Sequence, residues 1–305
     1  PILLGENPFF REKIWEKMMH MQRIVTQIDE RILSTIDLAL WDLVGIIMEQ
    51  PVNNILGLYR DKVPAYASTM CGDTIKGGLS TPEEYGNFAE WCVKEKGYRA
   101  VKLHGWMPPI EGAPDPKKDI MACAAVREAV GDDIPLMLDS YHFYSRMEAL
   151  WIGRELEKLN FYWFEEPLIY SNLAGCARLS EKMRTPIMLG ENFYGPRDMH
   201  EALKAKACDM VMPDLMRIGG VTGWMRAAAI AEQYSMAVSS HLMPEISAHL
   251  MLATPNRGWL EWTDWLEPIL KDPFEVQNGD VIVPNKSGVG IEWDEAALAR
   301  YAIDN

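Results

Sequence analysis

The chain has 305 residues, of which 48% are hydrophobic and 24% are charged, a composition typical of globular proteins. Its 30 basic and 44 acidic side chains give a net charge of −14 at pH 7. This excess of acid argues against nucleic acid or an anionic membrane as a partner, because both carry dense negative charge. The length suffices for one large barrel or for two domains of ordinary size.

The first 61 residues are predicted to be helical, with one helix over residues 10–25 and another over residues 36–48. The second helix is the most apolar stretch of the chain, but it carries Asp37 and Asp42 and is too short to cross a bilayer. The sequence shows no signal-peptide pattern, and its five cysteines are scattered without a C-x-x-C motif. These features favour a reduced, cytoplasmic protein.

From residue 63 onward, short apolar segments alternate with amphipathic helices, which predicts a parallel sheet. Eight such repeats indicate an α/β fold of the (β/α)₈ TIM-type barrel class. An open doubly wound sheet is the alternative, but no G-x-G-x-x-G follows the first strand. The predicted strands cover residues 63–69, 100–105, 135–140, 162–167, 186–191, 210–214, 237–241 and 259–262.

The tail from residue 273 reads as short strands and turns, followed by a helix over residues 294–303. We expect three parts: an accessory helical segment over residues 1–61, a catalytic barrel over 62–270, and a return to the accessory part over 271–305. The two ends are expected to pack together as a lid on the barrel.

Three predicted strands end in acids: Asp139, Glu165 and Glu191, each 26 residues after the one before. One strand–helix repeat has about this length, so the acids are expected at three successive strand tips, on the face where barrel active sites lie. Grouped carboxylates repel one another, and Mg²⁺ prefers such oxygen ligands. The alternative is three unrelated helix caps or solvated acids. Glu166 neighbours Glu165 on the strand and must therefore point elsewhere.

The next two predicted strands end in Asp214, which follows Pro213, and in His241. Adjacent strand tips can place the carboxylate against the imidazole, which orients the ring and makes it more basic. A turn aspartate and a surface histidine are the alternative. The last strand carries Glu261 between Trp259 and Trp262. This apolar setting predicts a raised pKa, so that a neutral Glu261 could donate a hydrogen bond; an exposed acid is the alternative.

The segments "LD", "WFEEP", "LGEN", "MPDLMRIGGVTGW", "SSHLMPEISAHLMLATP" and "WLEW" together resemble the mandelate racemase subgroup of the enolase superfamily. The resemblance implies a variant (β/α)₈ barrel with a partial α+β capping domain formed by both chain ends, whose opening three-stranded meander the sequence does not contain. It implies one Mg²⁺ per subunit and a homo-oligomer. The implied site comprises the metal ligands Asp139, Glu165 and Glu191, the Asp214–His241 dyad, the substrate-binding acid Glu261, and Glu166 and Asn192 as supports for the ligands.

In a strand, Lys102 and His104 face the same side because side chains two apart do so. The family carries a Lys-x-Lys there: Lys102 matches the first lysine, and His104 replaces the second, which is a base in the family. Three carboxylates, Mg²⁺ and an ene-diolate substrate sum to −3, so Lys102 is the expected compensating cation. Lys102 and Mg²⁺ should lower the pKa of His104. A hydrogen-bonded core histidine is the alternative for His104.

Residues 105–119 form a Pro-rich loop that lengthens this repeat to 35 residues between His104 and Asp139. We expect Trp106 and Met107 of this loop to contact substrate, although a rigid surface loop is an equal alternative. Tyr141 and His142, which follow Asp139, are also predicted to bind substrate.

The sequence therefore predicts a lyase that uses Mg²⁺ to abstract the proton α to a carboxylate. The expected reaction is dehydration of a sugar acid to a 2-keto-3-deoxy acid, with His241 as both base and acid. A racemase or epimerase of a 2-hydroxy acid is the alternative, and a metal-binding barrel without catalysis is a third reading. The expected partner is a small carboxylate substrate rather than nucleic acid or membrane.

Overall fold

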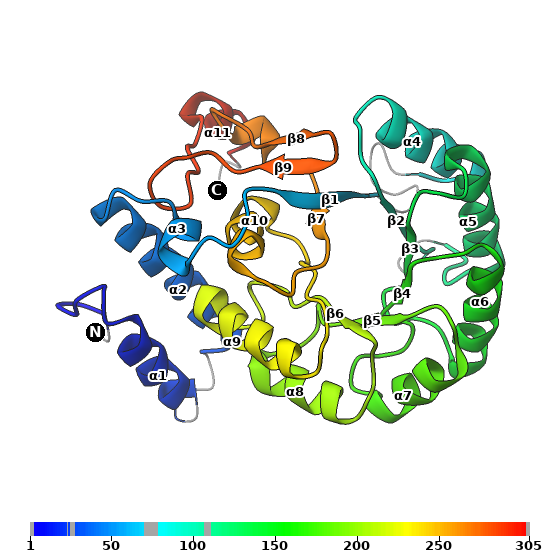
Figure 1. Cartoon of the computed structure of the whole chain (residues 1–305), viewed down its shortest axis with the longest axis horizontal. Coiled ribbons are helices and arrows are strands. Elements are labelled where there is room, and N and C mark those ends of the chain that lie inside the picture. Colours follow the sequence, from blue (N-terminus) through cyan, green and yellow to red (C-terminus); the bar gives the residue numbers. More distant parts are fainter. Residues whose placement is uncertain (1–2, 23, 25–27, 70–78, 107–110, 303–305) are drawn as a thin grey trace.

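The computed structural model of the 305-residue chain describes residues 3–22, 24, 28–69, 79–106 and 111–302. Figure 1 shows a ring of strands surrounded by helices, with the two chain ends on one side of the ring. The N-terminal segment contains α1 (Arg11–Gln22), α2 (Glu30–Ile47) and α3 (Val52–Leu56). Helix α2 starts where the Asp29 side chain accepts hydrogen bonds from two backbone N–H groups of the first turn.

The ring is built from parallel strands in the order β6-β5-β4-β3-β2-β1, and β7 pairs with β1 on the other side. Residues 237–241 close the circle: Val238 bridges Val211 on one side and Arg257 on the other. The expected strand over this segment is thus present only as isolated bridges, because pairing is confined to Val238 and His241. The strands are β1 (Val63–Ser68), β2 (Val101–His104), β3 (Leu136–Asp139), β4 (Trp163–Glu165), β5 (Ile187–Leu189), β6 (Met210–Val211) and β7 (Leu260–Trp262).

Helices follow most strands and cover the outside of the ring (Figure 1). Several begin with a side-chain cap: Thr81 opens α4 and Ser145 opens α6, each in a reciprocal pair with a glutamate three residues on. The remaining caps and apolar faces orient each helix on its strand, as in a (β/α)₈ barrel. The outer helices are α4 (Pro82–Lys94), α5 (Pro116–Val130), α6 (Arg146–Lys158), α7 (Leu173–Lys182), α8 (Gly195–Lys204), α9 (Gly220–Gln233) and α10 (Pro244–Ala253).

A separate cluster of buried side chains fills the inside of the ring. Met137 and Trp163 belong to it, and the register pairs them side by side on β3 and β4. Residues two further along these strands, Asp139 and Glu165, point to the same interior face and form the next layer. The apolar layer thus forms the floor on which the strand-end acids lie. The cluster comprises Tyr66, Ala100, Met137, Trp163, Met188 and Met212.

The tail runs through η1 (Glu267–Ile269), the hairpin of β8 (Glu275–Gln277) and β9 (Asp280–Ile282), and α11 (Glu295–Tyr301). It meets the N-terminal segment where the Val52 N–H donates to the Gly288 carbonyl at 2.9 Å and the Val289 N–H donates to Asp42 at 2.8 Å. The two ends therefore pack together as expected, whereas the boundaries at residues 61 and 270 stay predictions. Among the described helices, none is both long enough and apolar enough to cross a membrane.

Candidate active site

The three acids predicted from their spacing meet inside the ring. Asp139, Glu165 and Glu191 are all buried, and each offers a carboxylate oxygen within 4.8 Å of the other two. Asp139 and Glu165 end β3 and β4, and Glu191 follows β5 after Gly190. Gly190 has φ of 151°, and a Cβ there would lie 2.7 Å from the Met212 backbone, so only glycine lets the chain pass and place Glu191.

The electrostatics of this triad fit a divalent cation. Burial raises the pKa of Glu165 and of Glu191, and the neighbouring Asp139 carboxylate raises both further. Oε2 of Glu191 is buried without a hydrogen-bond donor. A buried carboxylate oxygen without a donor is costly unless a cation binds it. An all-carboxylate oxygen set is the kind that Mg²⁺ prefers.

Lys102 is fully buried beside the triad, with Nζ at 2.7 Å from Glu165 and 3.7 Å from Asp139. Its third carboxylate neighbour is Glu261, at 2.8 Å. Burial alone would lower the pKa of Lys102, but these carboxylates outweigh it and hold the pKa well above its usual range. Lys102 is therefore a fixed ammonium in the site, as expected for the compensating cation.

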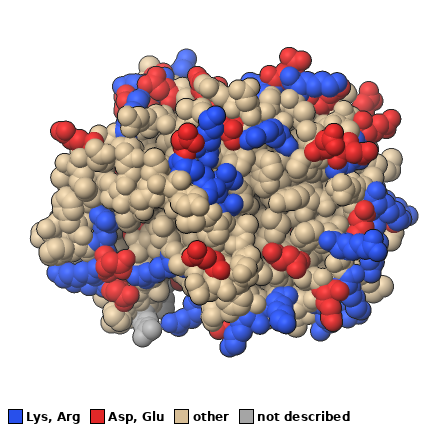
Figure 2. Space-filling model, viewed as in Figure 1, with Lys and Arg blue, Asp and Glu red and all other residues tan. Residues whose placement is uncertain are grey.

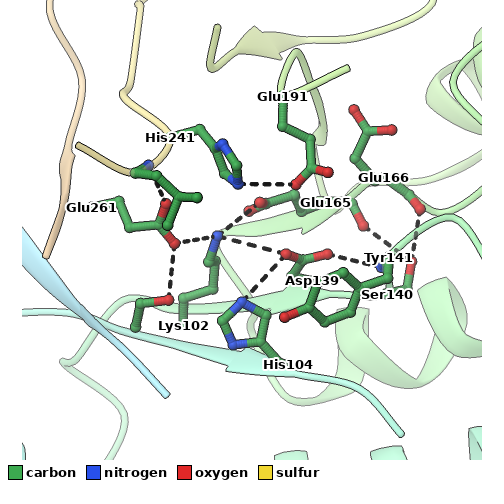
Figure 3. Close-up of polar contacts among 12 residues, drawn as sticks. Lys102, His104, Asp139, Ser140, Tyr141, Glu165, Glu166, Glu191, His241 and Glu261 are labelled. Atoms are coloured by element: carbon green, nitrogen blue, oxygen red, sulfur yellow. Dashed lines mark hydrogen bonds and ion pairs between the residues drawn. The ribbon is translucent and has the colours of Figure 1, made fainter. Parts of the chain in front are cut away.

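The predicted neutral state of Glu261 is wrong. Burial favours the neutral acid, but the charges of Lys102 and His241 and the hydrogen bonds from Lys102 and the Leu242 N–H together outweigh it and lower the pKa of Glu261 well below its usual range. Its carboxylate accepts hydrogen bonds at 2.8 Å from the Ser68 hydroxyl and the Leu242 N–H. Glu261 is thus an anion held by three donors (Figure 3), and it faces inward rather than solvent.

Asp214 and His241 form the predicted pair. Their backbones are bridged, and His241 Nδ1 lies 2.7 Å from Oδ2 of Asp214. Nδ1 therefore carries the proton, and Nε2 is directed to the triad, 3.4 Å from Oε2 of Glu191. Burial would lower the pKa of His241, but Glu191, Asp214 and other carboxylates outweigh it and raise the pKa to about 10. A cation in the triad would offset the negative charge that causes this rise.

His104 approaches the triad from the side opposite His241 (Figure 3). Its Nδ1 contacts the Thr69 carbonyl, which can only accept, so in the neutral ring Nδ1 carries the proton and Nε2 carries the lone pair. Nε2 lies 3.5 Å from Oδ2 of Asp139. Burial lowers the pKa of His104, and Lys102 adds to the effect against the opposing pull of Asp139. The expected direction is confirmed, with burial as the larger cause.

Glu166 and Asn192 lie beside the triad as supports. The Glu166 side chain turns away from the three ligands and accepts from the Gly190 N–H at 3.0 Å. Asn192 donates to Glu191 at 3.0 Å and accepts from Arg217 at 2.9 Å. Adjacent acids on β4 thus separate as the strand geometry requires, one into the triad and one behind it.

The residues that the sequence predicts to contact substrate lie in different surroundings. Tyr141 stacks on His104, with 5.0 Å between ring centroids, and its N–H donates to Asp139 (Figure 3). His142 is partly buried, and its Nδ1 has no hydrogen-bond partner. Trp106 is instead buried in the main core, with the Lys118 ammonium 3.3 Å from its ring centroid. Contact of these residues with substrate stays a prediction, and Met107 lies outside the described residues.

Sequence reasoning missed several polar groups that hold the site. Ser68 donates to Glu261, Thr69 fixes the His104 ring, and Arg217 donates to the Glu191 carbonyl at 2.7 Å. Trp163 donates to Oε2 of Glu165 at 2.8 Å. Only Trp163 left a local signal, since it precedes Glu165 by two residues on one strand and must share its face. The others come from neighbouring strands or the loops after them, which are far from their partners in the sequence.

With this geometry in place, the chain can be compared with known proteins. The sequence pattern of the family described as "Enolase C-terminal domain-like" matches residues 84–297. The chain therefore belongs to this family of enolase-type barrels, which confirms both the resemblance seen in the sequence and the barrel class.

The similar proteins include two sugar-acid dehydratases and a racemase. The L-talarate/galactarate dehydratase of Salmonella typhimurium is 32% identical over 297 residues, which cover 97% of this chain and 72% of the relative. The crystal structure of D-glucarate dehydratase from Agrobacterium tumefaciens with magnesium is 40% identical, with a TM-score of 0.92 over 98% of this chain and 81% of the other. A racemase of Streptomyces coelicolor with bound magnesium is 31% identical, with a TM-score of 0.88 over 99% and 81%.

Proposed function

We propose that the protein is a Mg²⁺-dependent dehydratase of sugar acids. The observation that carries the proposal is His241, whose Nε2 is aimed at the carboxylate triad while Asp214 fixes its tautomer. A purely structural metal site needs no oriented base beside it, so this geometry disfavours a barrel without catalysis. Dehydratases among the relatives, and the magnesium in the similar structures, support the same reading.

Asp139, Glu165 and Glu191 would hold the ion. When bound, Mg²⁺ polarises the substrate carboxylate and so acidifies the proton on the α-carbon. His241 then takes that proton at Nε2, while Asp214 stabilises the imidazolium through Nδ1. The negative charge that develops on the substrate is compensated by the fixed ammonium of Lys102.

Elimination completes the reaction. The electrons of the broken C2–H bond form a C2–C3 double bond, and the C3–O bond breaks. The His241 imidazolium returns its proton to the departing hydroxide, which leaves as water. The resulting enol takes up a proton at C3, releases the proton of its C2 hydroxyl to solvent and becomes the 2-keto-3-deoxy acid. His104, with its free Nε2, binds a substrate hydroxyl from the opposite side of the triad.

Racemisation or epimerisation of a 2-hydroxy acid is the second candidate function. It is favoured by one observation: His104 and His241 both direct Nε2 to the acids from opposite sides (Figure 3). Transfer of a proton between the two faces of an α-carbon needs such a pair. The racemase among the similar structures supports keeping this candidate.

A panel of acid sugars incubated with the enzyme and Mg²⁺ in D₂O separates the candidates. A dehydratase releases 2-keto acids, detected as semicarbazones, whereas a racemase returns starting acid deuterated at C2 with inverted configuration. Neither product, together with no solvent exchange of the α-proton, would leave only the non-catalytic barrel.

We also propose that the protein works in the cytoplasm as a homo-oligomer, with the capping and barrel parts divided near residues 61 and 270. The four cysteines in the described part of the chain are unpaired and buried, as expected in a reducing compartment. Helix α2 exposes apolar side chains, among them Ile32, Leu43 and Ile46, which would suit contact with another subunit. Light scattering of the purified protein would test the oligomer.

A further inference from the structure

Glu165 differs from the other triad acids because both of its oxygens already have donors. Lys102 donates to Oε1 at 2.7 Å, and the Trp163 indole N–H donates to Oε2 at 2.8 Å. Both donors are fully buried. A carboxylate with one donor can rotate about its terminal torsion, whereas two donors on different oxygens fix its plane. Hydrogen bonds to an ionised acceptor are also stronger than those between neutral groups.

We propose that Trp163 is a positioning residue for the metal site: its indole N–H holds Glu165 in the metal-binding orientation before the ion arrives. The proposal rests on the magnesium site of the proposed function. It gives the apolar layer beneath the triad a part in metal affinity, which Trp163 would exert through its hydrogen bond to Glu165.

The surroundings of Trp163 leave its indole ring little room to take another orientation. Its ring meets Tyr66 edge to face, with centroids 5.5 Å apart at 79°, and packs in the buried interior cluster. Swinging the indole away would leave its N–H buried without an acceptor, which is unfavourable. The packed floor therefore keeps the donor beneath Glu165, and the strand places the two residues on one face.

The fixed orientation matters because the three acids repel one another. In the absence of an ion, Asp139 and Glu191 favour rotation of the Glu165 carboxylate away from them. Trp163 opposes that rotation. Glu165 therefore does not have to be reoriented when the ion binds, and the binding free energy is not reduced by that step. Partners that orient metal ligands in this way typically change metal affinity by about 10- to 100-fold.

Titration calorimetry of the metal-free full chain with Mg²⁺, without substrate, tests the proposal. We expect Trp163→Phe, which keeps a ring but removes the N–H, to weaken Mg²⁺ binding by about 10- to 100-fold. The matched control is Trp224→Phe: Trp224 is equally buried and donates to Thr254 at 3.2 Å, on helix α9. Both variants should lose similar thermal stability without metal, but only Trp163→Phe should lose affinity.

Equal Mg²⁺ affinity in Trp163→Phe and the wild type would overturn the proposal, as would an equal loss in both variants. If Trp163→Phe does not fold, the wild type still decides. In ¹⁵N-indole spectra, the N–H whose ring shows contacts to Tyr66 should shift on addition of Mg²⁺, while that of Trp224 should not. An unchanged Trp163 signal would contradict the proposal. Because no readout depends on turnover, failure to dehydrate any sugar acid would count against the proposed function alone.

Discussion

Nδ1 of His241 lies 2.7 Å from Oδ2 of Asp214 at neighbouring strand ends, so in the neutral ring Nδ1 carries the proton and the lone pair of Nε2 is directed at the acid triad. Such a pair makes the ring a base of known tautomer.

His241→Asn should lower kcat by about 10²- to 10⁴-fold, the usual contribution of a general base, while KM changes modestly. Asp214→Asn should be milder, because it misorients the ring without removing it. Steady-state kinetics on the best acid sugar checks both. His20→Gln, exposed on α1, serves as the control. Normal turnover by His241→Asn would mean that another residue is the base.

Glu191→Gln tests the triad through stability as well as activity. Without metal, three buried acids repel one another, so removing one charge should leave the melting temperature equal or higher. With Mg²⁺ at about 100 times its Kd, the wild type gains about 2.7 kcal/mol and the variant should gain far less. Thermal melts in EDTA and in Mg²⁺ measure this change: the wild type should melt no higher than the variant in EDTA, but higher than the variant in Mg²⁺.

Asp37→Asn is the matched control for the triad, since Asp37 is also a buried acid but binds Thr222 at the junction of α2 and α9. It should retain the gain in Mg²⁺. Full activity of the wild type after exhaustive chelation would refute the metal site altogether.

His104→Asn separates the roles of the two imidazoles. If His104 binds a substrate hydroxyl, the variant should raise KM but keep exchange of the α-proton with D₂O, whereas His241→Asn should lose the exchange. Proton NMR of the substrate follows both. Loss of exchange in His104→Asn, with exchange intact in His241→Asn, would reverse the roles and favour a different face for proton abstraction.

His249 makes stability depend on pH away from the active site. It is buried between Asn53 and the Val289 carbonyl, and burial lowers its pKa to about 4. In the unfolded chain its pKa is about 6.5. Between these values the unfolded state binds a proton that the folded state excludes, so stability is full above about pH 6.5 and falls as pH drops toward 4. The loss approaches about 3 kcal/mol.

Urea unfolding from pH 7 to pH 4 measures this effect. His249→Gln, which cannot titrate, should flatten the decline over that range. The exposed His20→Gln should follow the wild type. An unchanged slope in His249→Gln would show that other groups cause the acid sensitivity.

The sequence allowed the triad and the dyad to be predicted because both depend on position within a strand–helix repeat. Asp139, Glu165 and Glu191 end strands of a regular repeat, and regular repeats bring their ends together. The charge of Glu261 was predicted wrongly for the opposite reason. Its chain neighbours Trp259 and Trp262 suggested an apolar setting, but its environment is set by Lys102, which belongs to a distant strand.

Other features of the site could not be predicted for the same reason: they depend on contacts between residues far apart in the sequence. Ser68 lies 193 residues from Glu261 in the sequence, and no local pattern announces that contact. Trp106 was predicted from its loop to contact substrate, which stays a prediction, and the fold buries its side chain in the core, where the Asp119 carboxylate accepts the Trp106 backbone N–H at 2.6 Å. Periodicity thus predicts which face a residue occupies, while contacts between neighbouring strands that are far apart in the sequence, such as β1 and β7, depend on closure of the barrel.

Strand β1 has a third partner besides β2 and β7: residues Val63 and Pro64 pair with Val281 and Asp280 of the tail hairpin. A ribosome makes β1 long before it makes β9, so during synthesis this part of β1 remains an unpaired edge. Such edges recruit strands from other chains and promote aggregation. Pro64 lacks an N–H and blunts the edge in the meantime. The tail hairpin therefore completes the pairing of β1 only after strands β1 to β7 of the barrel have been translated, and by doing so it covers an edge that would otherwise be open to other chains.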